Sequence, residues 1–225
     1  MDKEKDLVLV GDSAFAEVAY EYFTHDSPYR VAGFSVERAY LKRDRLCGLP
    51  VVPFEEVEKH FDPARHCLHV AVVYTQMNRL RERLCREAKA KGYPLASYIS
   101  SHAFVWRNVV LGEHCFIFEK NVVQPFVTLG NNVVLWSGNH IGHHSTIEDN
   151  CFISSHVVIS GYARIGANSF LGVNSCVSNN RTLGRDCWIG PGITIAQDVP
   201  DGSLFNLEKA VPSKVSSLRF FKIAG

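Results

Sequence analysis

The second half of the chain repeats itself with a period of six residues. Every sixth residue from Ile99 to Ile195 gives seventeen consecutive positions, and each of them is Ile, Leu or Val. These three residues make up about a quarter of the chain, so chance would fill all the positions with a probability of roughly a quarter to the seventeenth power. A period this strict predicts a repetitive fold in which one short strand recurs every six residues.

Two other positions of the repeat carry small residues. The fourth residue after the aliphatic is often small, as at Cys115, Ser145, Cys151, Ala163, Ser169, Ser175 and Cys187. Glycine suits a short strand that must turn every six residues, and it directly follows the aliphatic at Gly112, Gly130, Gly142, Gly166, Gly172, Gly184 and Gly190. The pattern resembles the hexapeptide repeat of the left-handed parallel β-helix, in which three hexapeptides make one triangular coil. Residues 99–198 would then form about five to six coils, stacked about 4.8 Å apart.

The first 98 residues follow a different pattern, in which short apolar runs alternate with amphipathic segments. Strands are expected at residues 7–10, 30–34 and 68–73, and helices at residues 14–23, 54–60 and 78–91. This order predicts a small Rossmann-like α/β domain, with a parallel sheet flanked by helices. We therefore expect an α/β domain over residues 1–98, a β-helix over residues 99–198 and a C-terminal tail over residues 199–225.

Composition narrows the class of protein. The chain of 225 residues is 46% hydrophobic and 21% charged, as in an ordinary soluble domain. Its net charge of +1 gives no global field for binding nucleic acid or an acidic membrane surface. No run approaches the roughly 18 apolar residues that a membrane helix needs, and the N-terminus lacks a signal-peptide pattern. We therefore expect a cytoplasmic protein.

The seven cysteines are scattered and form no CxxC pair, which predicts buried free thiols in a reducing compartment. Cys115, Cys151 and Cys187 recur every 36 residues, or every second coil, so neighbours would lie about 10 Å apart. At that separation they can neither pair nor share a metal. We expect them to be core thiols.

The segment WSGNHIGHHSTI at residues 136–147 holds three histidines. In the repeat, the second and third residues after the aliphatic lie at a corner of the coil, which is where His143 and His144 are expected. His140 precedes an aliphatic and should face outward from a flat side, and His156 lies two corners beyond His144. This spacing disfavours a metal site within one chain, and no metal is expected. The alternative for these histidines is that they only cap turns.

The motifs IGHHSTIEDNCFI and FLGVNSCV, together with the two-part layout, resemble bacterial sugar acyltransferases of the hexapeptide superfamily. The similarity is to the group that includes UDP-4-amino-sugar N-acetyltransferases and sialic acid O-acetyltransferases. This resemblance implies a CoA-dependent acyltransferase with acetyl-CoA as cosubstrate. It also implies a homotrimer in which each site lies between two neighbouring β-helices.

The resemblance assigns residues to the catalytic step. His143 occupies the place of the catalytic base, where a neutral imidazole can take the proton that an attacking amine or hydroxyl loses. His144 replaces the acidic residue that usually orients this base. Glu148 and Asp149, one corner away, are further candidates for the orienting role.

Two residues are candidates for contacts with CoA. Gly161 lies one coil above His143 and would offer its amide to the thioester oxygen, as a glycine does in the resembling enzymes. The Pro-Ser-Lys sequence at residues 212–214 resembles the closing Pro-Ala-Lys of that family. It makes Lys214 a candidate for binding a phosphate of CoA.

The segment LVLVGDSAFAEVAYEYF lies where the resembling enzymes hold the nucleotide of a sugar nucleotide. Gly11, Asp12 and Ser13 form its turn, but the G-x-G-x-x-G pattern of a dinucleotide site is absent. Amides at the start of the following helix could meet a phosphate. Ser35 stands where an acidic residue often follows the second strand. The alternative is a domain that only docks against its neighbour.

Several side chains are expected on the surface. The helix at residues 78–91 should present a solvated face made by Arg79, Arg81, Arg83 and Arg86. Apolar residues directly before the inward aliphatics should give the coils outer faces suited to a trimer interface; they include Val122, Val134, Val158 and Phe170. Trp136 is expected as a surface aromatic on such a face or interface.

The resemblance implies acetyl transfer to the amino group of a nucleotide-linked amino sugar of a bacterial surface glycan. One alternative is an O-acetyltransferase on the same fold. The other is a noncatalytic sugar-nucleotide-binding protein in which His143 only caps a turn.

Overall fold

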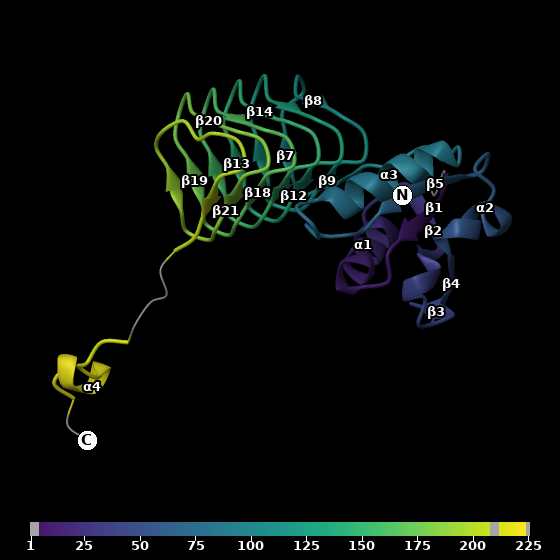
Figure 1. Cartoon of the computed structure of the whole chain (residues 1–225), viewed down its shortest axis with the longest axis horizontal. Coiled ribbons are helices and arrows are strands. Elements are labelled where there is room, and N and C mark those ends of the chain that lie inside the picture. Colours follow the sequence, from purple (N-terminus) through teal and green to yellow (C-terminus); the bar gives the residue numbers. More distant parts are fainter. Residues whose placement is uncertain (1–4, 208–211, 224–225) are drawn as a thin grey trace.

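The computed structural model describes residues 5–207 and 212–223, which form a small α/β domain followed by a stack of triangular coils (Figure 1). The N-terminal sheet has the order β3-β4-β2-β1-β5, and its neighbours are parallel except for β3 and β4. Its strands are β1 (Lys5–Val10), β2 (Tyr29–Val36), β3 (Arg45–Leu46), β4 (Leu49–Pro53) and β5 (His66–Val70). The apolar pattern does not predict β4, because Pro50 and Pro53 interrupt its run.

The three main helices lie where the sequence predicts them, and they cover both faces of this sheet. They are α1 (Ala14–His25), α2 (Val57–His60) and α3 (Arg79–Ala90), with 3-10 turns at Arg38–Tyr40 and Phe54–Glu56. Alternate residues of β1 point to opposite faces: Leu7 and Leu9 pack in the cluster that contains α1 side chains, while Val8 packs with residues of α2 and α3. The α1 side also faces the coils, since Phe15 and Phe23 of α1 pack on Phe116 of the β-helix.

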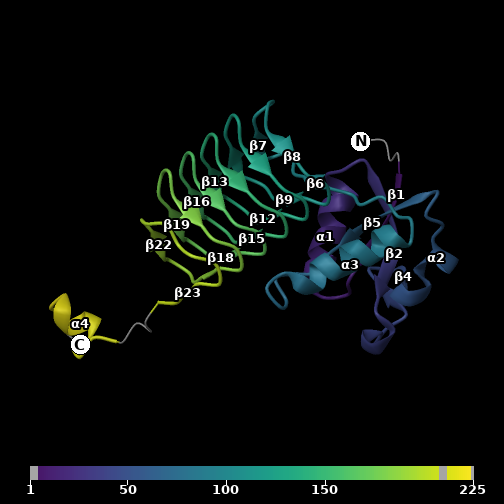
Figure 2. The ribbon, with the colours of Figure 1, turned by 45° about the horizontal axis from the view of Figure 1, so that its top comes forward.

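Three parallel sheets of two-residue strands form the sides of the coils, as expected for a left-handed β-helix (Figure 2). Face 1 contains β6 (Tyr98–Ile99), β9 (Phe116–Ile117), β12 (Val134–Leu135), β15 (Phe152–Ile153), β18 (Phe170–Leu171), β21 (Trp188–Ile189) and β23 (Leu204–Phe205). Face 2 contains β7 (Phe104–Val105), β10 (Val122–Val123), β13 (His140–Ile141), β16 (Val158–Ile159), β19 (Cys176–Val177) and β22 (Thr194–Ile195). Face 3 contains β8 (Val110–Leu111), β11 (Thr128–Leu129), β14 (Thr146–Ile147), β17 (Arg164–Ile165) and β20 (Thr182–Leu183).

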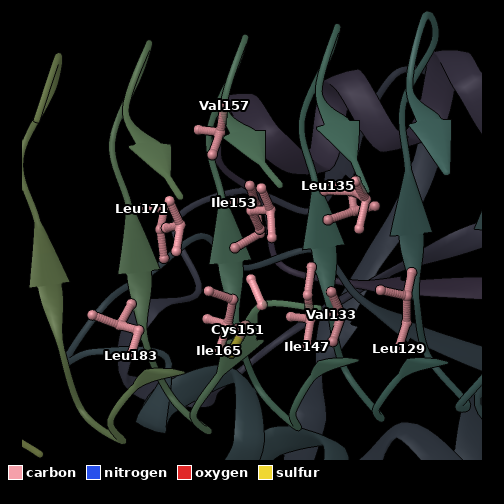
Figure 3. Packing of buried hydrophobic residues seen from close by; sticks show 14 of the residues in the cluster. Leu129, Val133, Leu135, Ile147, Cys151, Ile153, Val157, Ile165, Leu171 and Leu183 are labelled. Carbon is pink, nitrogen blue, oxygen red and sulfur yellow. The ribbon is translucent and has the colours of Figure 1, made fainter. Parts of the chain in front are cut away.

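The aliphatic residue of each repeat points into the coil and stacks on its equivalents in the coils above and below (Figure 3). From Ile117 to Ile195 these side chains are at most 3% exposed. Ile99 is 40% exposed because it lies in the first coil, which has no coil before it. The repeat read from the sequence is therefore the core of the β-helix.

The glycine that follows each aliphatic residue does not make the turn at the corner, contrary to the expectation from the sequence. Every sixth residue from His114 to Gly192 has a positive φ, and this residue is the third after the aliphatic. The glycine at the first position instead permits close approach between coils. A Cβ on Gly112, for example, would lie 2.5 Å from the carbonyl carbon of Gly130 in the next coil.

Face 1 packs against the α/β domain and is not a free surface. Val134 and Phe170 are only 2% and 6% exposed there, which corrects the expectation that both help to form an exposed outer face. Trp136 packs on Phe118 and on Phe15 of α1, with ring centroids 4.3 Å and 5.4 Å away. Its interface therefore lies within the chain. On face 2, by contrast, Val158 is 40% exposed.

Arg81 lies buried between the two halves of the chain, which corrects the expectation of a solvated face. Its Nε donates to Oδ1 of Asn132, a corner residue of the β-helix, at 2.8 Å. Further hydrogen bonds reach carbonyl oxygens that include those of Val73 and Cys151. Burial lowers the pKa of Arg81 to about 10. This guanidinium joins α3 to the coils.

Two stacked histidines, His69 of β5 and His114 of the turn between β8 and β9, lie beside Arg81, with their ring centroids 4.2 Å apart. His114 Nε2 accepts a 2.7 Å hydrogen bond from the Val70 N–H, and its Nδ1 lies 2.8 Å from Oδ1 of Asn132. This pattern requires a neutral ring with the proton on Nδ1. Burial lowers the pKa of His69 to about 4 and that of His114 well below its ordinary value.

Most of the cysteines lie inside the fold. Cys115, Cys151 and Cys187 are buried free thiols, as expected, and burial raises their pKa values. Cys47 is exposed, contrary to the expectation of buried thiols. Face 1 continues through β23, beyond the expected end of the β-helix at residue 198. Helix α4 (Ser217–Phe220) lies apart from the coils (Figure 1).

Candidate functional site

His143 and His144 lie at the corner that joins face 2 to face 3, in the turn between β13 and β14. Both side chains are exposed, and their Nδ1 atoms lie 3.1 Å apart. The backbone N–H of His143 donates to Oε1 of Gln124, one coil earlier, at 2.9 Å. His140 lies on the strand before this corner, on the outer side of face 2. The corner placement expected for the pair is therefore correct.

Two aromatic residues hold the ring of His144, and the sequence analysis missed both. Phe126 and Tyr162 lie at the same corner in the coils before and after it, at 18-residue spacing. Their ring centroids are 4.6 Å and 4.7 Å from that of His144, and both rings stack on it. The spacing of the coils sets these distances, because strands in a sheet lie about 4.8 Å apart. Reading positions one coil apart in the sequence would have revealed the stack.

Gly161 lies directly above the imidazole of His143. A Cβ at Gly161 would approach Cε1 and Nε2 of His143 to 2.9 Å, so only glycine leaves the ring in this position. No acceptor for the Gly161 N–H occurs among the described residues. The corner thus combines an imidazole nitrogen with a backbone donor that is free to bind an oxygen.

Glu148 and Asp149 lie at the next corner and bond to groups there. Glu148 pairs with Arg164, and its other oxygen accepts from the Ala167 N–H at 3.0 Å. Asp149 accepts from the Asn131 N–H at 2.7 Å. Neither carboxylate orients His143 within the same chain, where the Nδ1 of His143 faces His144 instead.

Lys214, the candidate for binding a CoA phosphate, is exposed in the segment just before α4. That segment lies apart from the coils (Figure 1), so the described fold does not bring Lys214 next to Gly161.

A second candidate region is a cavity of about 480 Å³ at the carboxyl ends of β1 and β2. Gly11, Asp12 and Ser13 line it, as expected for the turn that follows β1. The side chains of Lys42 and Arg43 also line it, and the sequence analysis missed them because they lie in an irregular loop. Arg43 Nε lies 3.6 Å from Oδ2 of Asp12.

Ser35 does not reach this cavity. Its side chain is fully buried, and its hydroxyl donates to the Val52 carbonyl oxygen at 3.2 Å. The strand continues to Val36, so the residue that follows it is Glu37, which lines the cavity and pairs with Arg83 of α3 at 3.0 Å. The sequence estimate ended β2 too early and therefore selected the wrong residue.

Chemically, the histidine corner can exchange a proton and bind an oxygen, while the cavity can bind an anion between its cationic side chains and the turn amides. Among residues 5–207 and 212–223, His, Cys, Asp and Glu side chains form no group of three that could hold a metal ion. The same residues include no helix long and apolar enough to cross a membrane.

Sequence profiles identify the repeat. A profile of the bacterial transferase hexapeptide, with six repeats, matches residues 126–161. A profile of the hexapeptide repeat of succinyl-transferase matches residues 162–197. Residues 126–197 therefore carry hexapeptide repeats of the kind found in bacterial transferases, and these repeats form part of the left-handed β-helix. No curated protein sequence matches it significantly.

Solved structures share the two-part fold over most of its length. The acetyltransferase domain of PglB from Neisseria gonorrhoeae is 25% identical, with a TM-score of 0.80, over 89% of this chain and 96% of that domain. The same domain has been solved in complex with acetyl coenzyme A. PerB from Caulobacter crescentus, in complex with CoA and GDP-perosamine, is 24% identical, with a TM-score of 0.77, over 88% of this chain and 92% of PerB.

Proposed function

We propose that the protein is a CoA-dependent acetyltransferase that acts on the amino group of a nucleotide-linked amino sugar. The observation that carries this proposal is the histidine corner, where the imidazole of His143 lies against Gly161, whose N–H has no acceptor among the described residues. An exposed imidazole next to a backbone donor is what acyl transfer from a thioester needs.

The proposed reaction uses both groups. The sugar amine attacks the thioester carbonyl carbon, a C–N bond forms, and the carbonyl electrons move to the oxygen, which the Gly161 N–H stabilises. Nε2 of His143 takes the proton that the amine loses. The C–S bond then breaks, and the thiolate of CoA accepts that proton. The products are the acetylated amino sugar and free CoA.

The substrate class is supported by the cavity of the α/β domain and by the comparisons. Lys42 and Arg43 supply positive charge for a diphosphate, next to the turn of Gly11, Asp12 and Ser13. PerB, which shares the two-part fold, is described with CoA and GDP-perosamine, and the PglB domain with acetyl coenzyme A. We expect acetyl-CoA to bind along the outside of the coils near Gly161, and we expect the enzyme to act in the cytoplasm.

The proposal includes a homotrimer, and the geometry of a single chain gives a reason for one. The α/β domain covers face 1, whereas His143 lies at the corner between faces 2 and 3, which is opposite face 1 in the triangular coil. The nucleotide cavity and the base of one chain are therefore on different sides of the β-helix. A neighbouring chain packed along face 2 or face 3 would bring its own α/β domain toward that corner.

The proposal is tested by incubating the protein with acetyl-CoA and a panel of amino sugar nucleotides, and following the release of free thiol. We expect thiol release that depends on an amino sugar nucleotide. His143→Asn should lower turnover by about 10²- to 10⁴-fold with nearly unchanged affinity for acetyl-CoA, while His140→Asn should stay within a few-fold of the wild type.

Two other outcomes would change the assignment. Release of thiol only with hydroxyl acceptors would indicate an O-acetyltransferase. If acetyl-CoA at saturating concentration does not raise the thermal stability, the proposal of CoA binding fails, because a ligand of the native state must stabilise it.

A further inference from the structure

The contact between His143 and His144 limits which of their ring nitrogens can carry a proton. Their Nδ1 atoms are 3.1 Å apart, so one nitrogen must donate and the other accept. A neutral imidazole carries one proton. If Nε2 of His143 is to accept the proton of the sugar amine, as in the function proposed above, the ring's own proton must be on Nδ1. That proton then points at His144.

We propose that His144 is the positioning residue for His143. Its unprotonated Nδ1 accepts the hydrogen bond from Nδ1–H of His143 and holds this ring in the tautomer with a free Nε2. In this role an imidazole replaces the carboxylate that the resembling enzymes carry at the same place. The proposal rests on the acetyl-transfer function only for its catalytic consequence, because the tautomer itself can be measured without turnover.

The surroundings of His144 fix its ring in the orientation that this role requires. Phe126 and Tyr162 stack on its two faces, at interplanar angles of 25° and 14°. The ring can therefore swing out of line only by breaking two stacking contacts. His143 is held as well, by the bond from its N–H to Gln124 and by its edge-to-face contact with Tyr162.

The same aromatic pair favours the state that follows proton transfer. Once Nε2 of His143 has accepted a proton, the two rings carry one positive charge, shared through the bond between their Nδ1 atoms. The π faces of Phe126 and Tyr162 lie directly against His144 and attract that charge. A neutral acceptor between two aromatic rings can thus take the place of a carboxylate.

Two substitutions of His144 test its hydrogen-bond acceptor and its ring stacking separately. In His144→Asn, Oδ1 takes the place of Nδ1, since each atom is bonded to Cγ, and asparagine tolerates the φ of 60° at this position. In His144→Phe, the stack is kept and the acceptor is lost. Phe126 and Tyr162, at φ of 65° and 59°, show that aromatic residues fit the same backbone conformation at this corner.

We expect turnover to fall at least about 10- to 100-fold in His144→Phe, the cost measured for losing partners that orient metal-binding histidines, with an unchanged KM for acetyl-CoA. His144→Asn should stay within a few-fold of the wild type. Equal losses in the two variants would overturn the proposal, because the acceptor that asparagine supplies would then make no difference to turnover. Wild-type turnover in His144→Phe would also overturn the proposal.

The direct measurement is the ¹⁵N chemical shift of the His143 ring nitrogens at about pH 8, where histidine rings are ordinarily neutral. In the wild type we expect a protonated Nδ1 and an unprotonated Nε2, and in His144→Phe a mixture of the two tautomers. A wild-type ring protonated at Nε2, or the same tautomer in both proteins, would overturn the proposal. If the wild type transfers no acetyl group, the proposed function fails, and these spectra still decide the role of His144.

Discussion

The stacked histidines between the two halves of the chain should make the fold sensitive to mild acid. Burial lowers the pKa of His69 to about 4 and that of His114 well below its ordinary value. In an unfolded chain, histidine takes up a proton below about pH 6.5. Between about pH 6.5 and 4 the unfolded state therefore binds more protons than the folded state, and the free energy of unfolding falls as the pH falls.

The size of this effect follows from the shift. With an unfolded pKa of about 6.5 and a folded pKa of about 4, His69 lowers the free energy of unfolding by about 2 kcal/mol on going from about pH 7.5 to about pH 5. His114 acts in the same direction, since a second proton would place its Nε2–H against the N–H of Val70. The contribution of His69 alone, about 2 kcal/mol, is already a sizeable part of the stability of an ordinary domain.

Urea unfolding at the two pH values tests this reasoning. His69→Phe keeps an aromatic ring against Phe23 and Phe116 but removes one of the two protonation sites. This variant should lose about 2 kcal/mol less than the wild type between about pH 7.5 and about pH 5. His60→Gln, at an exposed histidine, is the control and should lose as much as the wild type. If His69→Phe is as sensitive to acid as the wild type, the buried ring is not the cause.

Three further predictions concern the coils, the domain contact and the assembly. Gly161→Ala places a Cβ 2.9 Å from Nε2 of His143 and should lower turnover about 100-fold by displacing the ring; steady-state kinetics with unchanged turnover would contradict this. Arg81→Met removes one of the hydrogen bonds to Oδ1 of Asn132, which keeps its bond to His114, and also removes the guanidinium bonds to several carbonyl oxygens. It should lower the free energy of unfolding by about 3 kcal/mol, measured in urea, whereas a change below about 1 kcal/mol would show that the contact is dispensable. Light scattering at micromolar concentration should give a trimer, and a monomer would refute the arrangement of sites between neighbouring chains.

The β-helix could be predicted from the sequence because the direction of each side chain depends only on nearby positions in the chain. The position of a residue within six determines whether its side chain points inward, outward or to a corner, and the next coil repeats the choice. Ile141 therefore predicted that His143 and His144 share a corner, and the 18-residue spacing predicted that Gly161 lies above them. The turn itself was misjudged, because the left-handed residue is the third after the aliphatic and is often asparagine rather than glycine.

The α/β domain and its contact with the coils required the tertiary structure. The arginines of α3 look alike in the sequence, yet only the fold determines that Arg81 faces Asn132 and is buried, because the two residues belong to different halves of the chain. Ser35 was misplaced for a related reason, since the end of β2 is set by pairing with β4 rather than by apolar pattern.

The sequence by itself thus determined the repeat, the core and the corner that carries the histidines, since each depends on residues a fixed number of positions apart. The tertiary structure alone decided which face of the triangular coil the α/β domain covers, because all three faces follow the same six-residue pattern and the pattern does not distinguish them. Face 1 is covered, with Phe116, Phe152 and Phe170 packed beneath the domain, and the corner of His143 is the one opposite. That choice depends on the shape of a surface assembled from strands 18 residues apart, which no short stretch of sequence contains.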